Sequence, residues 1–534
     1  MPKALQLSLA VLLASMFAVS ADAATLKIYV NGSGTTNPAP GSYSVGFGQS
    51  RTIWAFPSTG WKFSHWSGSM SGSMNPNSIT CWFGTYTVYA NFVQLPPLSP
   101  DTALQHYMAH VDGNYSWDCY KTQVMFPYTN YFIDMTSHQW RDASEVDRPM
   151  WQHYVLIQKS WFSSSTCLFL IDGGSNGGSP PTQGDSTIGW ASVLTGYPVA
   201  MVKQIPNEPL YFTDEPGVRR SEDDILAYSF DKYMVTGDYK WNGHLPMTKA
   251  SVLAMDTIQR QIGSIDEFIV AGASKRGWTT WLVAATDDPR IIGYVPIVIP
   301  ILNVEEQMDH HWESYGFYAP AVTPYAEFDL FCRIKLPGGD DWKEIEDPYC
   351  YFGESSVIAN KPKLLVNASG DQFFMPDALR YYWDDIPGPG TKHVRIFPNC
   401  SHGFEEGDDL FLDALFTAIA WAGDVKNNSN PPAYAWTVGA NGITVTCGST
   451  PDSVALWQAT NPNARDFRVE EIGTVWTSSS LYNQGNNTFV GYCAPPAQGW
   501  TAYFVEINFG GGHIYTSEIV VTPDTLPYEG THCL

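Results

Sequence analysis

The sequence predicts an α/β core between two smaller β-domains, and three patterns predict it. Residues 101–424 alternate apolar, strand-like runs with helical patterns, which is typical of a mostly parallel sheet covered by helices. Residues 25–94 alternate apolar and polar side chains between turns rich in Gly and Pro. Residues 431–528 return to short strand patterns, which favour a β-sandwich of the immunoglobulin type. The chain of 534 residues is long enough for all three.

Residues 1–23 have the pattern of an export signal. Lys3 supplies a positive charge, an apolar stretch at 9–19 follows, and Ala21-Asp22-Ala23 is an A-x-A cleavage site. We therefore expect a secreted protein, periplasmic or extracellular, that begins near Ala24. The net charge of −24 argues against nucleic acid and anionic membranes as partners. No later apolar run is long enough to cross a membrane, so a membrane-spanning protein is not expected.

The first β-domain, residues 25–94, is rich in aromatic side chains. Its strings at 55–68 and 86–92 resemble the divergent InlB B-repeat family of bacterial secreted proteins. The resemblance implies a β-grasp-like spacer or adhesion module. The aromatic side chains are candidates for contact with a surface or a polysaccharide, although such side chains more often form a core. Residues 95–100, rich in Pro, are expected to form a semi-rigid linker.

The most informative string of the core is Gly272-Ala273-Ser274-Lys275-Arg276-Gly277, between an apolar run at 268–271 and a helical pattern at 278–285. A tight turn through a serine between a strand and a helix is the setting of a nucleophile elbow, where a strained bend lifts the hydroxyl above the sheet. The string departs from G-x-S-x-G, because Arg276 replaces the second glycine and Gly277 follows one residue later. Ser274 is the candidate nucleophile, and a plain strand-to-helix joint is the alternative.

Two further candidates follow in the chain order of α/β-hydrolases, which is Ser, then Asp, then His. The strand predicted at 364–368 leads to Asp371, and the strand predicted at 393–397 leads to His402. Open α/β sheets place their active sites at such strand ends. The imidazole takes the serine proton, and the carboxylate fixes the imidazole tautomer. The alternatives are that Asp371 caps a helix predicted over 376–383 and that His402 is an ordinary loop residue.

An oxyanion in the transition state needs backbone N–H donors. Lys275, the residue after the nucleophile, is expected to supply one. The loop 172–178, after a strand predicted at 167–171, is expected to supply another through Gly174 or Ser175. The sequence leaves open which of these amides donates.

The periodicity of the core also predicts a helix over 248–263, with Ala250, Ala254, Ile258 and Ile262 on one face. About residues 303–360 then interrupt the alternation of strands and helices, and an insertion at this place commonly caps a hydrolase active site. Its aromatic and acidic side chains suit either a substrate wall or the core of the cap. They are Trp312, Tyr315, Phe317, Tyr318, Asp340, Asp341 and Trp342.

Nine cysteines fit an oxidising compartment and leave at least one unpaired. The pairs to test first are Cys332 with Cys350 and Cys447 with Cys493. Neither a metal nor a cofactor is expected, because C-x-x-C and H-E-x-x-H spacings are missing and the adjacent His310 and His311 point to different sides of a helix. The strands expected in the C-terminal sandwich lie at 442–446, 453–457, 500–506 and 517–521.

Several short strings together mark a family. They are EVDRP (145–149), GGSN (173–176), QIPN (204–207), LPMTKA (245–250), AMDT (254–257), GASKRGWTTW (272–281), LN (302–303), RDFR (465–468) and GWTA (499–502). From about Tyr115 to Tyr528 the chain thus resembles the PhoPQ-activated pathogenicity-related proteins, which include autocrine proliferation repressor-like proteins. The resemblance implies an α/β-hydrolase-like core fused to a β-sandwich, with Ser274, Asp371 and His402 as the triad and without an assigned substrate.

Two classes of function follow. The first is a secreted serine hydrolase, an esterase or peptidase acting on a small-molecule ester, a glycan-linked ester or a peptide. The Ser-Lys-x-Gly elbow resembles that of glucuronoyl esterases, which favours esters over peptides. The second is a non-catalytic secreted binding or signalling protein that kept the fold. The complete Ser, Asp and His set favours the first, since a binding protein has no need of it.

Overall fold

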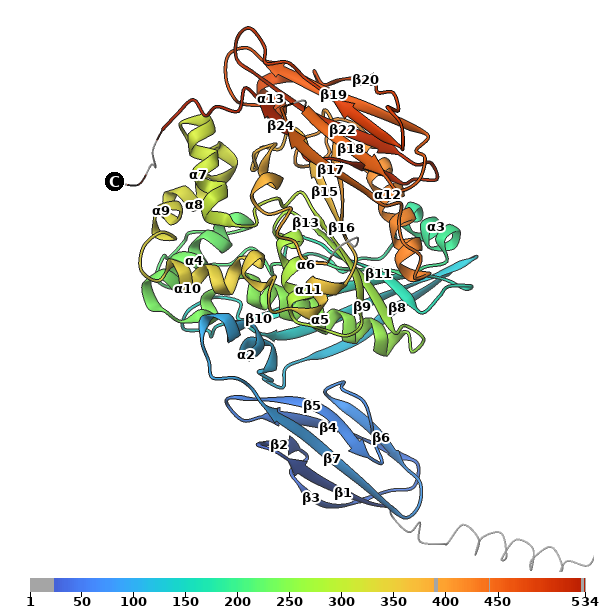
Figure 1. Ribbon diagram of the computed structural model, residues 1–534. Helices are drawn as coiled ribbons and strands as arrows, with labels where there is room; N and C mark the ends of the chain where they lie inside the picture. The colour runs from blue at the N-terminus through green and yellow to red at the C-terminus, as the bar shows by residue number, and fades with distance from the viewer. Residues whose placement is uncertain (1–23, 389–391, 441, 530–532, 534) are drawn as a thin grey trace, which may run out of the picture. The chain divides into compact units, whose positions relative to one another are not determined.

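The computed structural model describes residues 24–388, 392–440, 442–529 and 533 (Figure 1). The expected export signal lies outside these residues. The chain divides into two compact units between Gly113 and Asn114. The α/β core and the C-terminal strands fall in the same unit, whereas the N-terminal β-domain belongs to the other.

The N-terminal unit consists mainly of two small sheets. Its strands are β1 (Ala24–Asn31), β2 (Gly34–Asn37), β3 (Gly41–Val45), β4 (Gln49–Pro57), β5 (Trp61–Gly68), β6 (Asn77–Cys81) and β7 (Thr85–Gln94). One sheet has the order β3-β1-β7-β5 and the other β2-β4-β6. Leu26 and Ile28 of β1 are fully buried, whereas Lys27 and Tyr29 are not, so the alternation predicted from the sequence is confirmed. A 3-10 turn, η1 (Pro100–Thr102), and helix α2 (Ala103–Ala109) follow.

The aromatic side chains of this unit occupy both of the places that the sequence left open. Trp66 is buried in the core, and its indole N–H donates a hydrogen bond to the Met74 carbonyl at 2.9 Å. Phe47, Trp82 and Phe83 are exposed and contact one another. The unit therefore has an aromatic core and a separate aromatic surface cluster.

The second unit is organised around a nine-stranded sheet. Its strands are β8 (Ser116–Met125), β9 (Tyr128–Gln139), β10 (Met150–Ser160), β11 (Thr166–Ile171), β12 (Val199–Val202), β13 (Glu267–Ala273), β14 (Ile291–Ile297), β15 (Lys363–Ala368) and β16 (Lys392–Phe397). They lie in the order β16-β15-β14-β13-β11-β12-β10-β9-β8. The first six in this order are parallel, and β10, β9 and β8 are antiparallel to their neighbours. Every residue of β15 is buried, as expected of a parallel strand covered on both faces.

Helices cover this sheet and form the cap. The longer ones are α3 (Ser186–Thr195), α4 (Asp223–Thr236), α5 (His244–Gln261), α6 (Lys275–Ala285), α7 (Val304–Tyr315) and α12 (Asp408–Lys426). Helix α5 confirms the helix predicted over 248–263, and its Ala250, Ala254 and Ile258 are fully buried. The insertion at 303–360 contains α7 and the short helices α8 (Thr323–Glu327), α9 (Leu330–Arg333), α10 (Gly339–Glu346) and α11 (Ser356–Asn360). Helices α8, α9 and α10 pack against α4 (Figure 1).

Two predicted elements are wrong. The helix expected over 376–383 is only a short 3-10 turn, η5 (Ala378–Tyr381), because buried side chains on both sides of the turn, such as Asp377 and Tyr382, leave it no solvent-facing side. The strand expected over 517–521 is broken into β23 (Ile514–Thr516) and β24 (Val520–Thr522). Ser517 interrupts the ladder, since its hydroxyl accepts a hydrogen bond from the Val505 N–H at 3.0 Å.

The C-terminal strands form two antiparallel sheets around a common core. The remaining strands are β17 (Tyr434–Gly439), β18 (Gly442–Cys447), β19 (Ser453–Asn461), β20 (Thr477–Ser480), β21 (Thr488–Gly491) and β22 (Trp500–Asn508). One sheet is β17-β18-β21, and the other is β20-β19-β22-β23 with β24 also paired to β22. Ile443, Val505 and Ile507 are fully buried between them. Strand β23 packs against β16, so this sandwich adjoins the edge of the central sheet.

A buried ion pair joins the sandwich to the cap. Arg465, in the loop after β19, is fully buried and donates to Asp377 Oδ2 at 2.6 Å. His310 of α7 contacts the other oxygen of Asp377 at 2.8 Å through Nε2, and Arg465 also donates to Ser314 Oγ at 3.0 Å. The RDFR string therefore lies at the interface between the two parts of this unit.

The disulfide predictions are wrong. The disulfide in the described chain joins Cys332 of α9 to Cys533 near the C-terminus, 201 residues apart. Cys350, Cys447 and Cys493 are free. The pairing depends on how the tail runs back to the cap, which local sequence spacing does not reveal.

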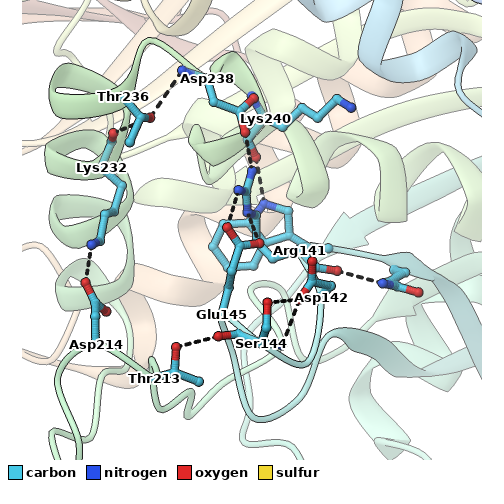
Figure 2. A network of polar contacts seen from close by, with 12 residues as sticks. Arg141, Asp142, Ser144, Glu145, Thr213, Asp214, Lys232, Thr236, Asp238 and Lys240 are labelled. Carbon is cyan, nitrogen blue, oxygen red and sulfur yellow. Dashed lines mark hydrogen bonds and ion pairs between the residues drawn. The ribbon is translucent and has the colours of Figure 1, made fainter.

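A second polar network anchors the loop between β9 and β10 (Figure 2). Arg141 holds both Glu145, through two hydrogen bonds of 2.6 and 3.0 Å, and Asp238, at 2.7 Å. Its guanidinium lies 3.9 Å from the centre of the Trp241 ring. Since Glu145 opens the EVDRP string and Asp238 follows α4, this arginine ties the string to the helical layer.

Candidate active site

Ser274 lies at a strained turn between β13 and α6. Its φ of 58° and ψ of −129° are unusual for a residue with a side chain. A side chain at Gly272 would collide with the Arg276 carbonyl, and a Cβ at Gly277 would lie 2.8 Å from Ile299 Cγ2. The second glycine of the elbow is thus needed at 277, where the helix passes closest to the neighbouring strand, and position 276 is free to carry an arginine.

Asp371 and His402 meet beyond the ends of β15 and β16. His402 Nδ1 lies 2.8 Å from Asp371 Oδ2. The Phe373 N–H donates to the other carboxylate oxygen at 2.7 Å, and the His402 N–H donates to Gln372 Oε1 at 2.9 Å. An ionised carboxylate accepts only, so the hydrogen bond places the imidazole proton on Nδ1 and leaves the lone pair on Nε2.

The free nitrogen of His402 and the Ser274 side chain face one cleft of about 790 Å³. His402 Nε2 is buried and has no hydrogen-bond partner in the part of the chain that the structure describes. No hydrogen bond joins it to Ser274 among these residues; such bonds are often long in unliganded enzymes and tighten when substrate binds. The structure therefore brings all three predicted residues to one edge of the sheet, with the Asp–His contact formed.

The candidate donors of an oxyanion hole lie on both sides of Ser274. Lys275 begins α6 directly after the serine. Gly174 lines the same cleft as Ser274, and its φ of 125° favours glycine. Ser175 instead pairs with Glu208 in a parallel bridge, and its carbonyl accepts a hydrogen bond from the Gln204 side chain at 2.9 Å. The geometry favours the Gly174 amide over that of Ser175 as the second donor.

A charged cluster beside the elbow was missed by the sequence analysis. Arg276 donates to both oxygens of Glu222 at 2.8 Å, and Lys275 Nζ lies 2.7 Å from Glu222 and 2.9 Å from Asp223. Glu222, like Ser274, has a positive φ, 53°. No local motif marks these acidic residues, which lie some 50 positions before the elbow.

The electrostatics of this cluster are set by burial and by its two cations. Burial alone would raise the pKa of Glu222, but the hydrogen bonds from Arg276 and the charge of Lys275 lower it well below its ordinary value. Burial and the neighbouring Glu222 carboxylate raise the pKa of Glu208. The cations next to the nucleophile are thus neutralised by fixed carboxylates.

The adjacent histidines of α7 serve separate contacts. His310 binds Asp377, and His311 Nε2 accepts a hydrogen bond from the Ala319 N–H at 3.0 Å. Burial lowers the pKa of His311 to about 3. Across the described ranges, no group of three or more His, Cys, Asp or Glu side chains is placed to hold a metal ion. None of the helices within these ranges is both long and apolar enough to cross a membrane.

The cap residues named by the sequence analysis divide between both alternatives. Trp342 is buried on the wall of a cavity that also reaches Ser274. Tyr315 instead packs in a small core with Ala319 and Met375. Asp340 is largely exposed and forms an ion pair with Lys343. One side of the cap therefore faces the candidate site, and the rest is structural.

Comparison with known proteins gives the family. The model of the PhoPQ-activated pathogenicity-related protein family matches residues 104–468. Autocrine proliferation repressor protein A of Dictyostelium discoideum is 31% identical over 462 residues, which cover 80% of this chain and 92% of that protein.

Solved structures with some similarity include acetyl xylan esterase 1 from Thermoanaerobacterium sp. JW/SL YS485, at 14% identity and a TM-score of 0.39, covering 59% of this chain and 91% of that one. Another is the acylaminoacyl peptidase of Pyrococcus horikoshii, at 11% identity and a TM-score of 0.35, covering 58% of this chain and 49% of that one. The family model matches more than half of the chain, and its match ends at Arg468, the last residue of the RDFR string. The chain therefore belongs to the PhoPQ-activated pathogenicity-related protein family.

Proposed function

We propose that this protein is a secreted serine hydrolase, most suited to esters, in which Ser274 is the nucleophile, His402 the general base and Asp371 the orienting carboxylate. One observation carries the proposal. The Asp371–His402 hydrogen bond leaves a buried, unpartnered Nε2 in the cleft that also holds the strained Ser274. A structural histidine would be expected to use both ring nitrogens.

The chemistry follows from these positions. Ser274 Oγ attacks the substrate carbonyl carbon and passes its proton to His402 Nε2, while Nδ1–H stays bonded to Asp371. The N–H groups of Lys275 and Gly174 stabilise the oxyanion. His402 then protonates the leaving group, and water attacks the acyl-enzyme by the same route in reverse. Because the nearby cations already have acidic partners, the oxyanion depends on backbone donors.

Labelling by a fluorophosphonate probe tests the nucleophile. We expect the intact protein to be labelled and Ser274→Ala to lose both the label and hydrolysis of an activated ester. Ser356→Ala, in the exposed turn at α11, is the matched control and is expected to keep both. His402→Ala is expected to lower kcat roughly 10³-fold or more, and Asp371→Asn somewhat less. A folded Ser274→Ala variant with unchanged kcat would contradict the assignment.

Signalling is the second candidate function, because the curated relative is named for repression of proliferation. The Ser274→Ala variant separates the two. If added protein slows proliferation and the variant does so equally, the fold acts as a ligand and the triad is not needed for that effect. If only the intact protein acts, signalling depends on hydrolysis.

Export and the roles of the terminal domains belong to the same proposal. Cleavage near Ala24 is tested by the N-terminal sequence of protein collected outside the cytoplasm. The N-terminal unit is proposed to be an InlB B-repeat-like, β-grasp-like module whose exposed Phe47, Trp82 and Phe83 contact a surface or polysaccharide. The C-terminal sandwich is proposed to be of the immunoglobulin type and to stabilise the core.

A further inference from the structure

Ser274 borders a second cavity, separate from the cleft that holds His402. This cavity lies between the elbow, helix α4 and the cap. Its apolar wall is formed by Phe230, Met234, Trp278, Ile299, Ile301, Val304, Met308, Val322, Tyr325, Leu330, Phe331, Ile334, Trp342, Phe373 and Phe374. Both the core and the cap thus supply its wall, and the candidate nucleophile stands where the two cavities meet.

The charged groups at this cavity are already paired. The ionisable side chains with charge on its wall are Asp223 and Lys275, which lie 2.9 Å apart. The Tyr325 hydroxyl of the cap donates to Asp223 at 2.8 Å, and Lys275 has Glu222 as a second partner. A charged ligand group would have to compete with these contacts and lose its hydration. The cavity is therefore suited to an uncharged group.

The size of the cavity limits that group. Its volume is about 60 Å³, measured as the space open to the centre of a water molecule. At ~10–15 Å³ of such space for each water and ~30 Å³ of liquid volume per molecule, it holds about four to six waters, or roughly 120 to 180 Å³. This is room for one six-membered ring or a short branched chain, and too little for a long unbranched chain.

We propose that this cavity binds an uncharged apolar group of the substrate, a single aromatic ring or a short branched aliphatic chain, next to the bond that Ser274 attacks. The inference rests on the proposed hydrolase function for its catalytic readout. Filling the cavity removes apolar surface of ligand and wall from water, and a difference of one methylene in such a pocket changes kcat/KM by about 10- to 200-fold. The cavity is thereby a selectivity pocket.

The test uses a substitution that fills the pocket and a matched one that does not. Val322, in the 3-10 turn η3 (Pro320–Val322), is buried on the wall, whereas Leu336 of the cap is 58% exposed and lies off it. Val322→Phe and Leu336→Phe are compared with the intact protein on ethyl acetate, ethyl isovalerate and ethyl benzoate, and on the acetates of ethanol, isobutanol and benzyl alcohol. The first series varies the acyl group and the second the alcohol.

We expect the intact protein to favour the ring or branched chain in one series, which identifies the group that enters the cavity. Val322→Phe should lower kcat/KM at least about 10-fold for those members and leave ethyl acetate nearly unchanged, while Leu336→Phe changes neither. If Val322→Phe does not fold, Ile301→Ala enlarges the same wall and should move the preference to larger groups. Equal selectivity in the intact protein and the folded wall variants would overturn the proposal.

Binding of 4-fluorotoluene, followed by ¹⁹F NMR, separates this inference from the proposed function. If the cavity binds the probe in the intact protein and loses it in Val322→Phe, the pocket stands even when none of the esters is hydrolysed, and only the hydrolase proposal fails. If esters are hydrolysed but the probe does not bind and selectivity does not respond to the wall, the pocket proposal alone fails.

Discussion

Replacing Arg465 with methionine tests how the sandwich is held to the α/β core. The arginine is fully buried, and its Nη2 lies 2.6 Å from Asp377 Oδ2. Methionine keeps much of the apolar stem but removes the charge and the donors. Asp377 is then left buried with His310 as its remaining close partner at 2.8 Å, while Arg380 lies at 3.5 Å.

The expected cost is about 3–5 kcal/mol of unfolding free energy, the usual loss when one partner of a buried pair is removed. It also depends on pH. Burial would raise the pKa of Asp377, but Arg465 and His310 hold it well below its ordinary value. In the intact protein this carboxylate therefore adds stability above its unfolded pKa, and that stability is lost only in strong acid. Without Arg465 burial prevails, so the carboxyl can take up a proton and the cost of the substitution should shrink at pH 4.5.

Urea unfolding at pH 7 and pH 4.5 measures both effects. Arg148→Met is the matched control, because Arg148 is half exposed and lies 4.0 Å from Asp147; its loss should cost at most about 1 kcal/mol. A loss below about 1 kcal/mol for Arg465→Met at pH 7 would refute the idea that this pair holds the two parts together. A loss that is equal at both pH values would refute the role given to the Asp377 charge.

Two further predictions concern stability. Cys332→Ser should lower the unfolding free energy by about 2–5 kcal/mol, because the disulfide closes a loop of 201 residues; Cys350→Ser, which removes a free thiol, should change little, and equal urea midpoints for the two would count against a structural disulfide. Burial lowers the pKa of His153 to about 4, below its unfolded value of ~6.5, so the neutral form stabilises the fold above pH ~6.5 and this contribution falls by up to about 1.4 kcal/mol for each pH unit toward pH 4. His153→Gln should flatten the dependence of urea stability on pH between about 6.5 and 4, and an unchanged slope would contradict it.

Much of the core was predictable because its signals are local. A buried parallel strand such as β15 is a continuous apolar run, and α5 repeats small apolar residues at helical spacing. The elbow is also local, since Gly272, Ser274 and Gly277 lie within six positions. Chain order alone gave Asp371 and His402 as candidates, and the structure places them in contact.

The elements that failed depend on distant partners. Asp377 lies in a short turn because Arg465 and His310 draw its side chain into the protein, 88 and 67 positions away in sequence. The Cys332–Cys533 pair likewise joins the cap to the tail.

The sequence by itself determined the family, the α/β architecture and the three residues of the candidate triad, since each is written in short strings and in the order of strands. Only the tertiary structure decided what surrounds them. Glu222 reaches Arg276 across 54 positions, and Val322 reaches the cavity at Ser274 from the cap. Side chains are paired in space by the packing of whole elements, so a local pattern can specify a strand or a turn but not the wall that closes over it.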